Sequence, residues 1–239
     1  MDTSNPLLKR DIDFSATEAT GSMELQGVIN KTGLLLLLCM GAAFFAWNAQ
    51  PALQMPLIIL GLIGGLVACL VGTFMPATSP FAAPAYAVLE GLVLGSLSQM
   101  FELRFPGIVA NAMLLTFSVL GLMLVLYSTR IIRVTGRFMV GVMIATGSIF
   151  VVYLIDMVMH LFGMNFPYLH DSSPLGIIIS LVIVGIAAAN LLVDFAVIET
   201  NVEQRAPKYM EWSCGMALLV TLVWLYLELL RLLSKLQKR

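Results

Sequence analysis

Long apolar runs separated by short polar segments make up most of the chain after its first thirty residues. The runs approach or exceed the ~20 residues that a helix needs to cross a bilayer core of ~30 Å. We predict membrane spans over about 32–47, 55–74, 85–101, 108–127, 138–162, 174–198 and 211–233. The pattern therefore predicts an all-α, polytopic membrane protein of about seven transmembrane helices.

The polar segment before the first run is long and mixed in charge, with acids and bases in similar number. A cleavable signal peptide would start with a short basic region and reach its apolar core sooner. We therefore predict that residues 1–30 form a polar cytoplasmic head and that residues 31–239 form a seven-helix transmembrane domain. The first span is expected to be retained.

Lysine and arginine are unevenly distributed over the polar segments, and this distribution sets the orientation of a membrane protein. With the head inside, the inner segments carry Lys9, Arg10, Lys31, Arg130, Arg133, Arg137, Arg205 and Lys208. The outer loops carry only Arg104, so the N-terminus is predicted to be cytoplasmic. The tail is the exception, with Arg231, Lys235, Lys238 and Arg239. Its charge leaves open that the last segment dips back without crossing.

Composition supports a membrane protein and argues against several other classes. The chain is 59% hydrophobic and 11% charged, whereas ordinary soluble domains are roughly 25% charged. A net charge of −1 gives no footprint for nucleic acid. The three cysteines lie inside apolar runs and are odd in number, which indicates buried thiols and not a disulfide framework or zinc site.

No sequence motif for common enzymatic chemistry occurs in the chain. HExxH, GxSxG and a Walker loop are all missing, and two histidines are too few for a histidine-built metal centre. We therefore expect neither an enzyme nor a bound cofactor. An intramembrane hydrolase remains open, because motif absence alone does not rule it out.

Two acids lie inside predicted spans in the half towards the cytoplasmic edge. Asp194 lies in the sixth span and Glu90 in the third, and no span interior holds a lysine or arginine to neutralise either one. An ionised carboxylate at such a depth costs ~2.5–3.5 kcal/mol or more unless it is paired, hydrated or protonated. On the predicted topology both acids lie at a similar depth from the cytoplasmic edge, where Glu211 also begins the seventh span. We therefore predict that Glu90 approaches Asp194.

Two carboxylates in one poorly solvated site cannot comfortably both ionise, so they share a proton. Such a pair responds to pH, and when deprotonated it attracts hard cations such as Ca²⁺. The alternative is local satisfaction of each acid. Asn190, Ser98 and Thr221 are candidate hydrogen-bond partners of Asp194, and Glu90 could extend towards the interface.

The remaining membrane-embedded ionisable groups suggest local pairs. Asp156 and His160 lie at positions i and i+4, on one face of a helix. Glu228 lies one turn before Arg231, which predicts an intrahelical ion pair. Glu211 is expected at the membrane interface.

Small residues and prolines mark the expected helix contacts and breaks. The pairs Gly61-xxx-Gly65 and Gly91-xxx-Gly95 permit close approach of two helices. The segment MPATSPFAAP is expected to be a link between spans, because its prolines lack the donor that a helix needs.

Several segments resemble the Bax inhibitor/YccA-type membrane proteins, the TMBIM superfamily, and its bacterial branch in particular. They are LLVDFAVIE, TLVWLYLELLRLLSKL, NPLLKR, LQGVINKTGLLLLL, and APAYAVLEGLVLGSLSQMFE with PGIV, so the resemblance covers essentially the whole chain. It implies a last helix surrounded by the other six. It also implies a pH-sensitive cation leak, notably of Ca²⁺, governed by acids on the last two helices, in a bacterial plasma (inner) membrane.

Only one acid of the family's pair carries over to this sequence. Asp194 falls on the acid of the penultimate helix, whereas Thr221 stands where calcium-leaking members have an aspartate. The link at 76–84 also lacks the basic residue that latches the acid pair in some members. These departures shift attention to Glu90 and Glu211 as partner acids.

We therefore predict two alternative functions. The first is a pH-sensitive leak channel for Ca²⁺ or H⁺ governed by membrane-embedded carboxylates. The candidate pH-sensing or ion-pathway residues are Asp194, Glu90, Glu211, Thr221 and Glu228, and Asp194 and Glu90 are candidate Ca²⁺ ligands. The second is a regulatory protein that binds and modulates a membrane protease or translocase. The expected partners are the lipid bilayer, cations and other membrane proteins.

Overall fold

The computed structural model describes residues 21–162 and 171–238, so most of the predicted head and His170 lie outside the described residues. The described residues form seven long helices and one 3₁₀ turn. They are α2 (Leu25–Trp47), α3 (Pro51–Phe74), η1 (Pro76–Thr78), α4 (Ser79–Arg104), α5 (Ile108–Ser128), α6 (Gly136–Leu161), α7 (Pro174–Glu203) and α8 (Met210–Gln237). All seven helices are long and apolar enough to cross a membrane. The predicted all-α, seven-span class is confirmed.

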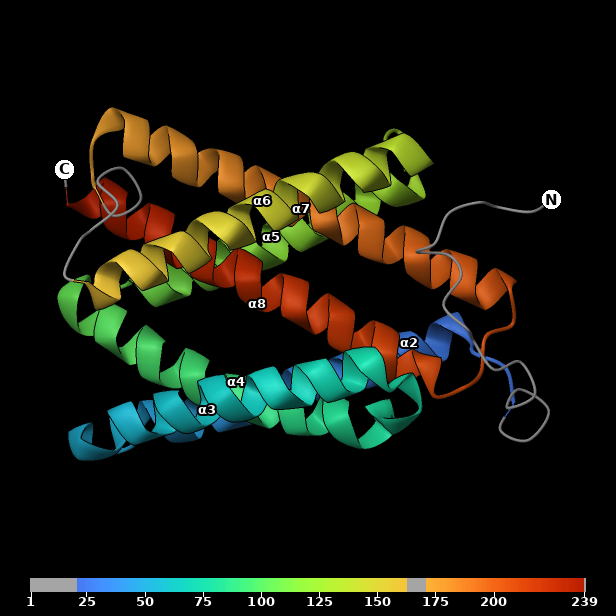
Figure 1. Cartoon of the computed structure of the whole chain (residues 1–239), viewed down its shortest axis with the longest axis horizontal. Helices are drawn as coiled ribbons and strands as arrows, with labels where there is room; N and C mark the ends of the chain where they lie inside the picture. The colour runs from blue at the N-terminus through green and yellow to red at the C-terminus, as the bar shows by residue number, and fades with distance from the viewer. Residues whose placement is uncertain (1–20, 163–170, 239) are drawn as a thin grey trace.

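Helix α8 lies at the centre of the bundle. It runs between α2, α3 and α4 on one side and α5, α6 and α7 on the other (Figure 1), and it packs directly on α2, α4, α5 and α7. In its most apolar 18-residue stretch 61% of the residues are buried, against 6% in α6. Helix α3 packs chiefly on α4, and α6 chiefly on α7. The central last helix is therefore confirmed, with four close neighbours and two peripheral helices.

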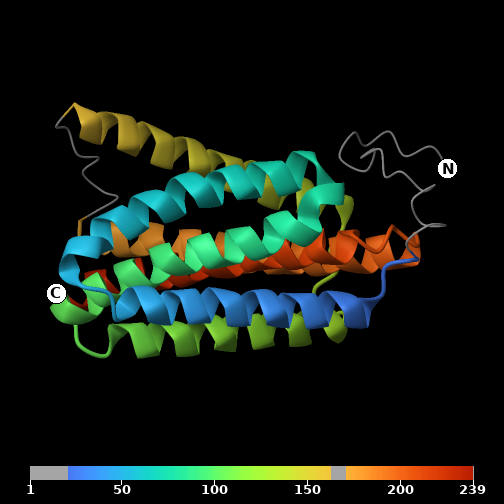
Figure 2. The same ribbon diagram turned by 90° about the horizontal axis from the view of Figure 1, so that it is seen from below.

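Successive helices run in opposite directions along the bundle, as Figure 2 shows. We call the end where α2, α4, α6 and α8 begin the basic end, because most lysines and arginines of the connecting segments lie there. The other end is called the opposite end. The outer surface between them is apolar, with Phe44, Phe74 and Phe81 each more than 70% exposed. Apolar surface of this kind is suited to contact with lipid and not with water.

The largest differences between the helix boundaries and the prediction are at two starts. Helix α2 begins at Leu25, earlier than the expected residue 32, because its first turns pack against the start of α8. Helix α4 begins at Ser79 and includes two of the prolines that were expected to break it. Pro80 lies in the first turn, where the missing N–H has no partner to lose. Pro84 lacks only the hydrogen bond that its N–H would donate to the carbonyl of Pro80 in that first turn. The helix therefore includes both prolines, and the link before it is reduced to the short turn η1.

Both Gly-xxx-Gly pairs lie at helix interfaces, as the sequence suggested. Gly91 and Gly95 of α4 face the backbone carbonyls of Cys39 and Ala43 in α2, so closely that an added Cβ would overlap them. Gly61 of α3 meets a backbone carbonyl of α4 in the same way. These contacts hold α2, α3 and α4 together as one group.

The segment before α2 is tied to the loop between α7 and α8. The Met23 N–H donates to the Ala206 carbonyl at 2.7 Å, and the Lys208 N–H donates to the Gly21 carbonyl at 3.0 Å. The Met23 side chain is buried and packs in a cluster with Ile198. The basic end of α2, α7 and α8 is therefore closed by this segment.

Candidate functional site: a buried acid between the last two helices

Asp194 lies on the side of α7 that faces α8. The two helices are held together there by apolar contacts, among them Ala187 and Leu191 of α7 with Leu225 of α8. The Asp194 Oδ2 atom is buried and has no hydrogen-bond partner among the described residues. The Thr221 hydroxyl of α8 interacts with the carboxylate. The centre of this interface is therefore a carboxyl–hydroxyl pair.

The partner of Asp194 is the residue that the family resemblance aligned with a second acid. Thr221 contributes one hydroxyl, which also donates to the Ala217 carbonyl at 3.3 Å. No ion pair in the described part of the chain includes Asp194. The site thus holds one ionisable group and one neutral oxygen, and one of the carboxylate oxygens is left without a donor.

The predicted approach of Glu90 to Asp194 is wrong. Glu90 faces α3, where a Cβ added to Gly65 would lie 3.3 Å from the Glu90 Oε2 atom. Its electrostatic neighbours are Cys39, Cys69 and Tyr86. Helices α4 and α7 are not among the closely packed pairs. The two acids therefore lie in different helix groups, so they do not form a joint Ca²⁺ site.

Glu211 has a structural position at the basic end. It is buried, forms an ion pair with Lys31 of α2, and accepts a hydrogen bond from the Glu24 N–H at 3.1 Å. Glu211 lies in the first turn of α8, and the start of α2 covers its side chain; its expected position at the membrane interface stays a prediction. Gly27 of α2 lies directly against the Glu211 carboxylate, so a larger residue at position 27 would overlap it.

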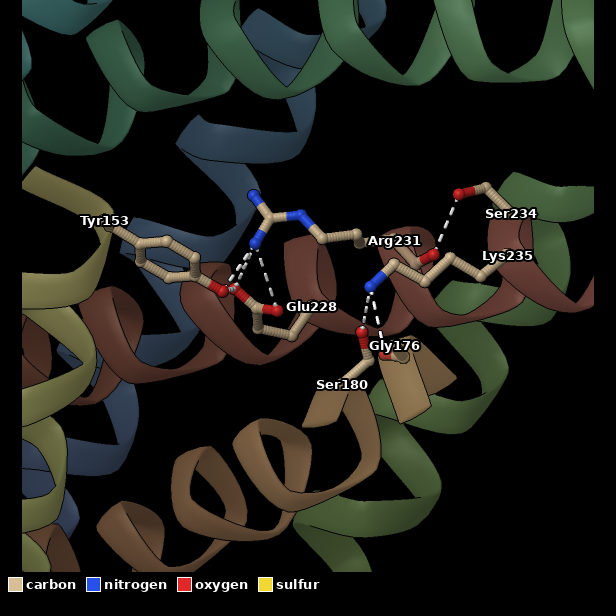
Figure 3. Close-up of polar contacts among 7 residues, drawn as sticks. All are labelled: Tyr153, Gly176, Ser180, Glu228, Arg231, Ser234 and Lys235. Atoms are coloured by element: carbon tan, nitrogen blue, oxygen red, sulfur yellow. Dashed lines mark hydrogen bonds and ion pairs between the residues drawn. The ribbon is translucent and has the colours of Figure 1, made fainter. Parts of the chain in front are cut away.

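Glu228 is part of a polar network in the half of the bundle near the opposite end (Figure 3). Its carboxylate accepts a hydrogen bond from the Tyr153 hydroxyl at 2.6 Å and is paired with Arg231 at 3.0 Å. The predicted intrahelical ion pair is confirmed. Tyr153 was missed, because it comes from α6 and nothing in the sequence joins it to α8.

Lys235 is buried in the same region, also without having been predicted. Its ammonium group donates to the Gly176 carbonyl at 3.1 Å and to the Ser180 hydroxyl at 2.7 Å, both on α7 (Figure 3). Only 3% of the residue is exposed. Two of the four basic residues assigned to the tail, Arg231 and Lys235, therefore lie within the bundle. The spacing of Glu228, Arg231 and Lys235 along one helix face is the signal that could have indicated this.

A cavity of about 490 Å³ opens at the basic end of α5 and α7. Its lining residues are Tyr127, Arg130, Ile132, Arg133, Val134, Ala196, Glu199, Thr200 and Glu203. Glu199 accepts hydrogen bonds from the Tyr127 hydroxyl and, at 2.6 Å, from Arg130. The Tyr127 ring packs on the ring of Phe195, with 5.7 Å between centroids. Phe195 directly follows Asp194 in α7, so the acid lies one residue along the chain from this aromatic pair.

The described residues contain no group of three or more histidine, cysteine, aspartate or glutamate side chains that could hold a metal ion. Oxygen ligands for a bound Ca²⁺ usually number 6–8, roughly. Asp194 and Thr221 alone fall well short of that number.

The described residues form seven membrane-length helices, one of them central and carrying buried ionisable groups, and this arrangement defines an integral, multi-pass α-helical membrane protein. A sequence model of the family described as Bax inhibitor 1 like matches residues 5–238, and the chain belongs to this family. Searches among curated proteins and among solved structures returned no match.

Proposed function

We propose that the protein is a pH-sensitive cation leak pathway and that Asp194 is its titrating group. The single observation that carries the proposal is the buried Asp194 carboxylate, which has no ion-pair partner and one oxygen without a donor. The two buried acids of α8, Glu211 and Glu228, are each neutralised by a base. Among the acids of α7 and α8 that lie within this helix pair, Asp194 is therefore the one without a neutralising base.

Access to Asp194 comes from the basic end. The cavity there is lined by Ala196, Glu199 and other residues of the last turns of α7. A helix rises 1.5 Å per residue, so Ala196 lies about 3 Å along the axis from Asp194. The ring of Tyr127, which lines the cavity, packs on the ring of Phe195 next to the acid. In this proposal a rotation of these rings connects the cavity with Asp194.

The protonation state of Asp194 would bias the α7–α8 interface. A protonated carboxyl can donate a hydrogen bond to the Thr221 hydroxyl and needs no counter-ion, which favours the closed packing. An ionised carboxylate in the same place is costly unless water or a cation reaches it. Ionisation therefore favours an arrangement that opens the interface, and the carboxylate and hydroxyl oxygens then suit a hard cation.

The half near the opposite end is closed in this conformation. Glu228, Arg231 and Lys235 hold α8 to Tyr153 of α6 and to the first turns of α7. Asp171 lies near enough to Lys235 to act on its charge, so this region holds two acids beside its two bases. Conduction therefore requires α8 to shift against α6 and α7, so that these contacts separate.

Reconstituted liposomes provide the test. We expect cation flux that depends on pH, measured with an internal Ca²⁺ indicator and, separately, a pH dye. Asp194→Asn keeps the shape but cannot titrate, so flux through it should lose most of its pH dependence. Asp156→Asn, an acid of α6 outside this interface, is the matched control and should retain the dependence. An unchanged pH profile in Asp194→Asn would exclude Asp194 as the sensor.

A second variant uses the partner position. Thr221→Asp places two carboxylates together, as the calcium-leaking relatives are expected to have them, and should make the pH dependence steeper because the two share a proton. Thr221→Val should instead leave the slope close to that of the parent. If the parent shows no flux at any pH, the leak proposal fails, and a regulatory protein that binds other membrane machinery becomes the preferred function.

We also propose that the basic end faces the cytoplasm of a bacterial cell, with the chain in the plasma membrane. The support is the lysine and arginine distribution, which becomes more one-sided once Arg231 and Lys235 are seen inside the bundle. Of the described residues after Ser234, Lys238 is then the remaining base in the tail at the opposite end.

A further inference from the structure

The cavity at the basic end carries two pairs of opposite charges, and only one pair is internally satisfied. Arg130 is bound to Glu199 at 2.6 Å, and Glu199 also accepts from Tyr127. Arg133 and Glu203 line the same cavity but make no ion pair or hydrogen bond in the described part of the chain. A cavity with one free cation and one free anion is suited to a ligand with both charges.

The backbone fixes the first pair in place. Arg130 has φ of +57°, in the left-handed region that bulky residues rarely adopt. It stands directly after the last turn of α5, where glycine is common. This conformation turns the loop over the end of α7, so that Arg130 reaches Glu199 and Arg133 remains at the cavity wall. Glu199 and Arg130 therefore form the wall of the cavity and not its ligand-binding charges.

The cavity lies where lipid headgroups would meet the protein. It is formed by the last turns of α5 and α7 and the loop after α5, at the ends of membrane-length helices. Basic pockets between transmembrane helices on the cytoplasmic side are known to accept lipid headgroups. Ile132, Val134 and Ala196 supply apolar lining, and exposed side chains such as Val125 and Val197 continue this surface along the helices. Acyl chains could follow that surface into the bilayer.

We propose that this cavity binds a zwitterionic aminophospholipid, with its phosphate on Arg133 and its ammonium group on Glu203. The volume of about 490 Å³ lies within the roughly 300–1,000 Å³ of ordinary ligand sites. The lining carries two bases and two acids, and Arg130 is already paired with Glu199. A polyanionic headgroup has no cation to offer the Glu203 carboxylate, so it would leave this acid unpaired. Arginine suits the phosphate, because its planar fork donates two parallel hydrogen bonds. The primary ammonium of phosphatidylethanolamine can donate to a carboxylate, which the trimethylated choline headgroup cannot do.

Native mass spectrometry of the full chain in detergent, titrated with single lipids, tests the proposal without measuring flux. We expect phosphatidylethanolamine to bind several-fold more tightly than phosphatidylcholine of the same chains. Arg133→Gln should weaken ethanolamine-lipid binding about tenfold, the loss expected for one charge-assisted phosphate contact. Glu203→Gln should bring the ratio between the two lipids close to one. Arg137 is a nearby exposed base that does not line the cavity. Arg137→Gln should therefore leave the binding of both lipids unchanged.

Several outcomes would overturn the proposal. Equal binding of the ethanolamine and choline lipids by the parent would remove the role of Glu203. Tighter binding of phosphatidylglycerol would indicate an anionic-lipid site, and full displacement by free phosphoethanolamine would indicate a soluble ligand instead of a lipid. Equal effects of Arg133→Gln and Arg137→Gln would indicate general surface charge. Because Arg133, Arg137 and Glu203 are all exposed, none of the three substitutions is expected to prevent folding.

Discussion

Removing Arg231 should expose how strongly the polar network near the opposite end holds the bundle. Arg231→Met keeps most of the side-chain length but leaves the Glu228 carboxylate without its counter-ion. That carboxylate is 2% exposed, so water cannot replace the lost charge. Its remaining donor is the Tyr153 hydroxyl at 2.6 Å. The variant therefore tests the cost of an uncompensated charge inside the bundle.

The magnitude follows from the geometry of the pair. At 3.0 Å and an effective dielectric constant of about 20, two unit charges attract by about 5 kcal/mol. The Arg231 side chain is 34% exposed, so water screens part of this attraction. Breaking a buried pair from one side costs about 3–5 kcal/mol, and the exposure of Arg231 places the expectation near 3 kcal/mol. The ratio of folded to unfolded protein should then fall by more than about a hundredfold.

Equilibrium unfolding in mixed micelles of a mild detergent and sodium dodecyl sulfate, followed by tryptophan fluorescence, measures this loss. The double variant Arg231→Met, Glu228→Leu should be closer to the parent, within about 1.5 kcal/mol, because it removes the stranded charge and leaves one hydroxyl without an acceptor. A double variant as unstable as the single one would show that Arg231 acts through packing, and the electrostatic reasoning would be refuted.

Three further expectations follow from the ends and interfaces of the bundle. With the native cysteines replaced, an impermeant thiol reagent added outside cells should label Ser172→Cys and not Thr135→Cys, and the reverse pattern would overturn the proposed orientation. Lys31→Met should lower the free energy of unfolding by about 3 kcal/mol in the same micelle assay, because its acid partner stays buried; a change below about 1 kcal/mol would contradict this. Gly95→Ala should cost about 1–3 kcal/mol, the usual range for an overpacked contact. Gly41→Ala, where an added Cβ meets nothing within 4 Å, is its control and should be neutral or slightly stabilising.

The sequence predicted the positions of the spans along the chain far better than the direction in which each side chain points. Span positions follow from the length of apolar runs, and the depths of Asp194 and Glu90 follow from the span boundaries. The direction of a side chain around the helix axis does not follow in the same way, because lipid and protein interior are both apolar and leave no clear polar face. Glu90 therefore faces α3, whereas its predicted partner faces α8.

Pairs within one helix were predictable, and pairs between helices were not. Glu228 and Arg231 lie one turn apart, so their ion pair could be predicted from spacing alone and is present. The partners of Glu211 and Lys235 come from helices that are distant in sequence. Only the packing of α2 and α7 on α8 brings them together, and a single sequence contains no direct signal of that packing.

The central position of α8 has a consequence for how the protein is made. This helix carries Glu211, Glu228, Arg231 and Lys235, and each is satisfied by an atom of another helix or by its neighbour one turn away. A charged side chain at the centre of an isolated helix adds ~2.5–3.5 kcal/mol to the free energy of entering lipid. Membrane insertion of α8 should therefore depend on the earlier helices remaining beside the insertion machinery. Helix α8 can then pack against these helices as it leaves the machinery, and it is never surrounded by lipid alone.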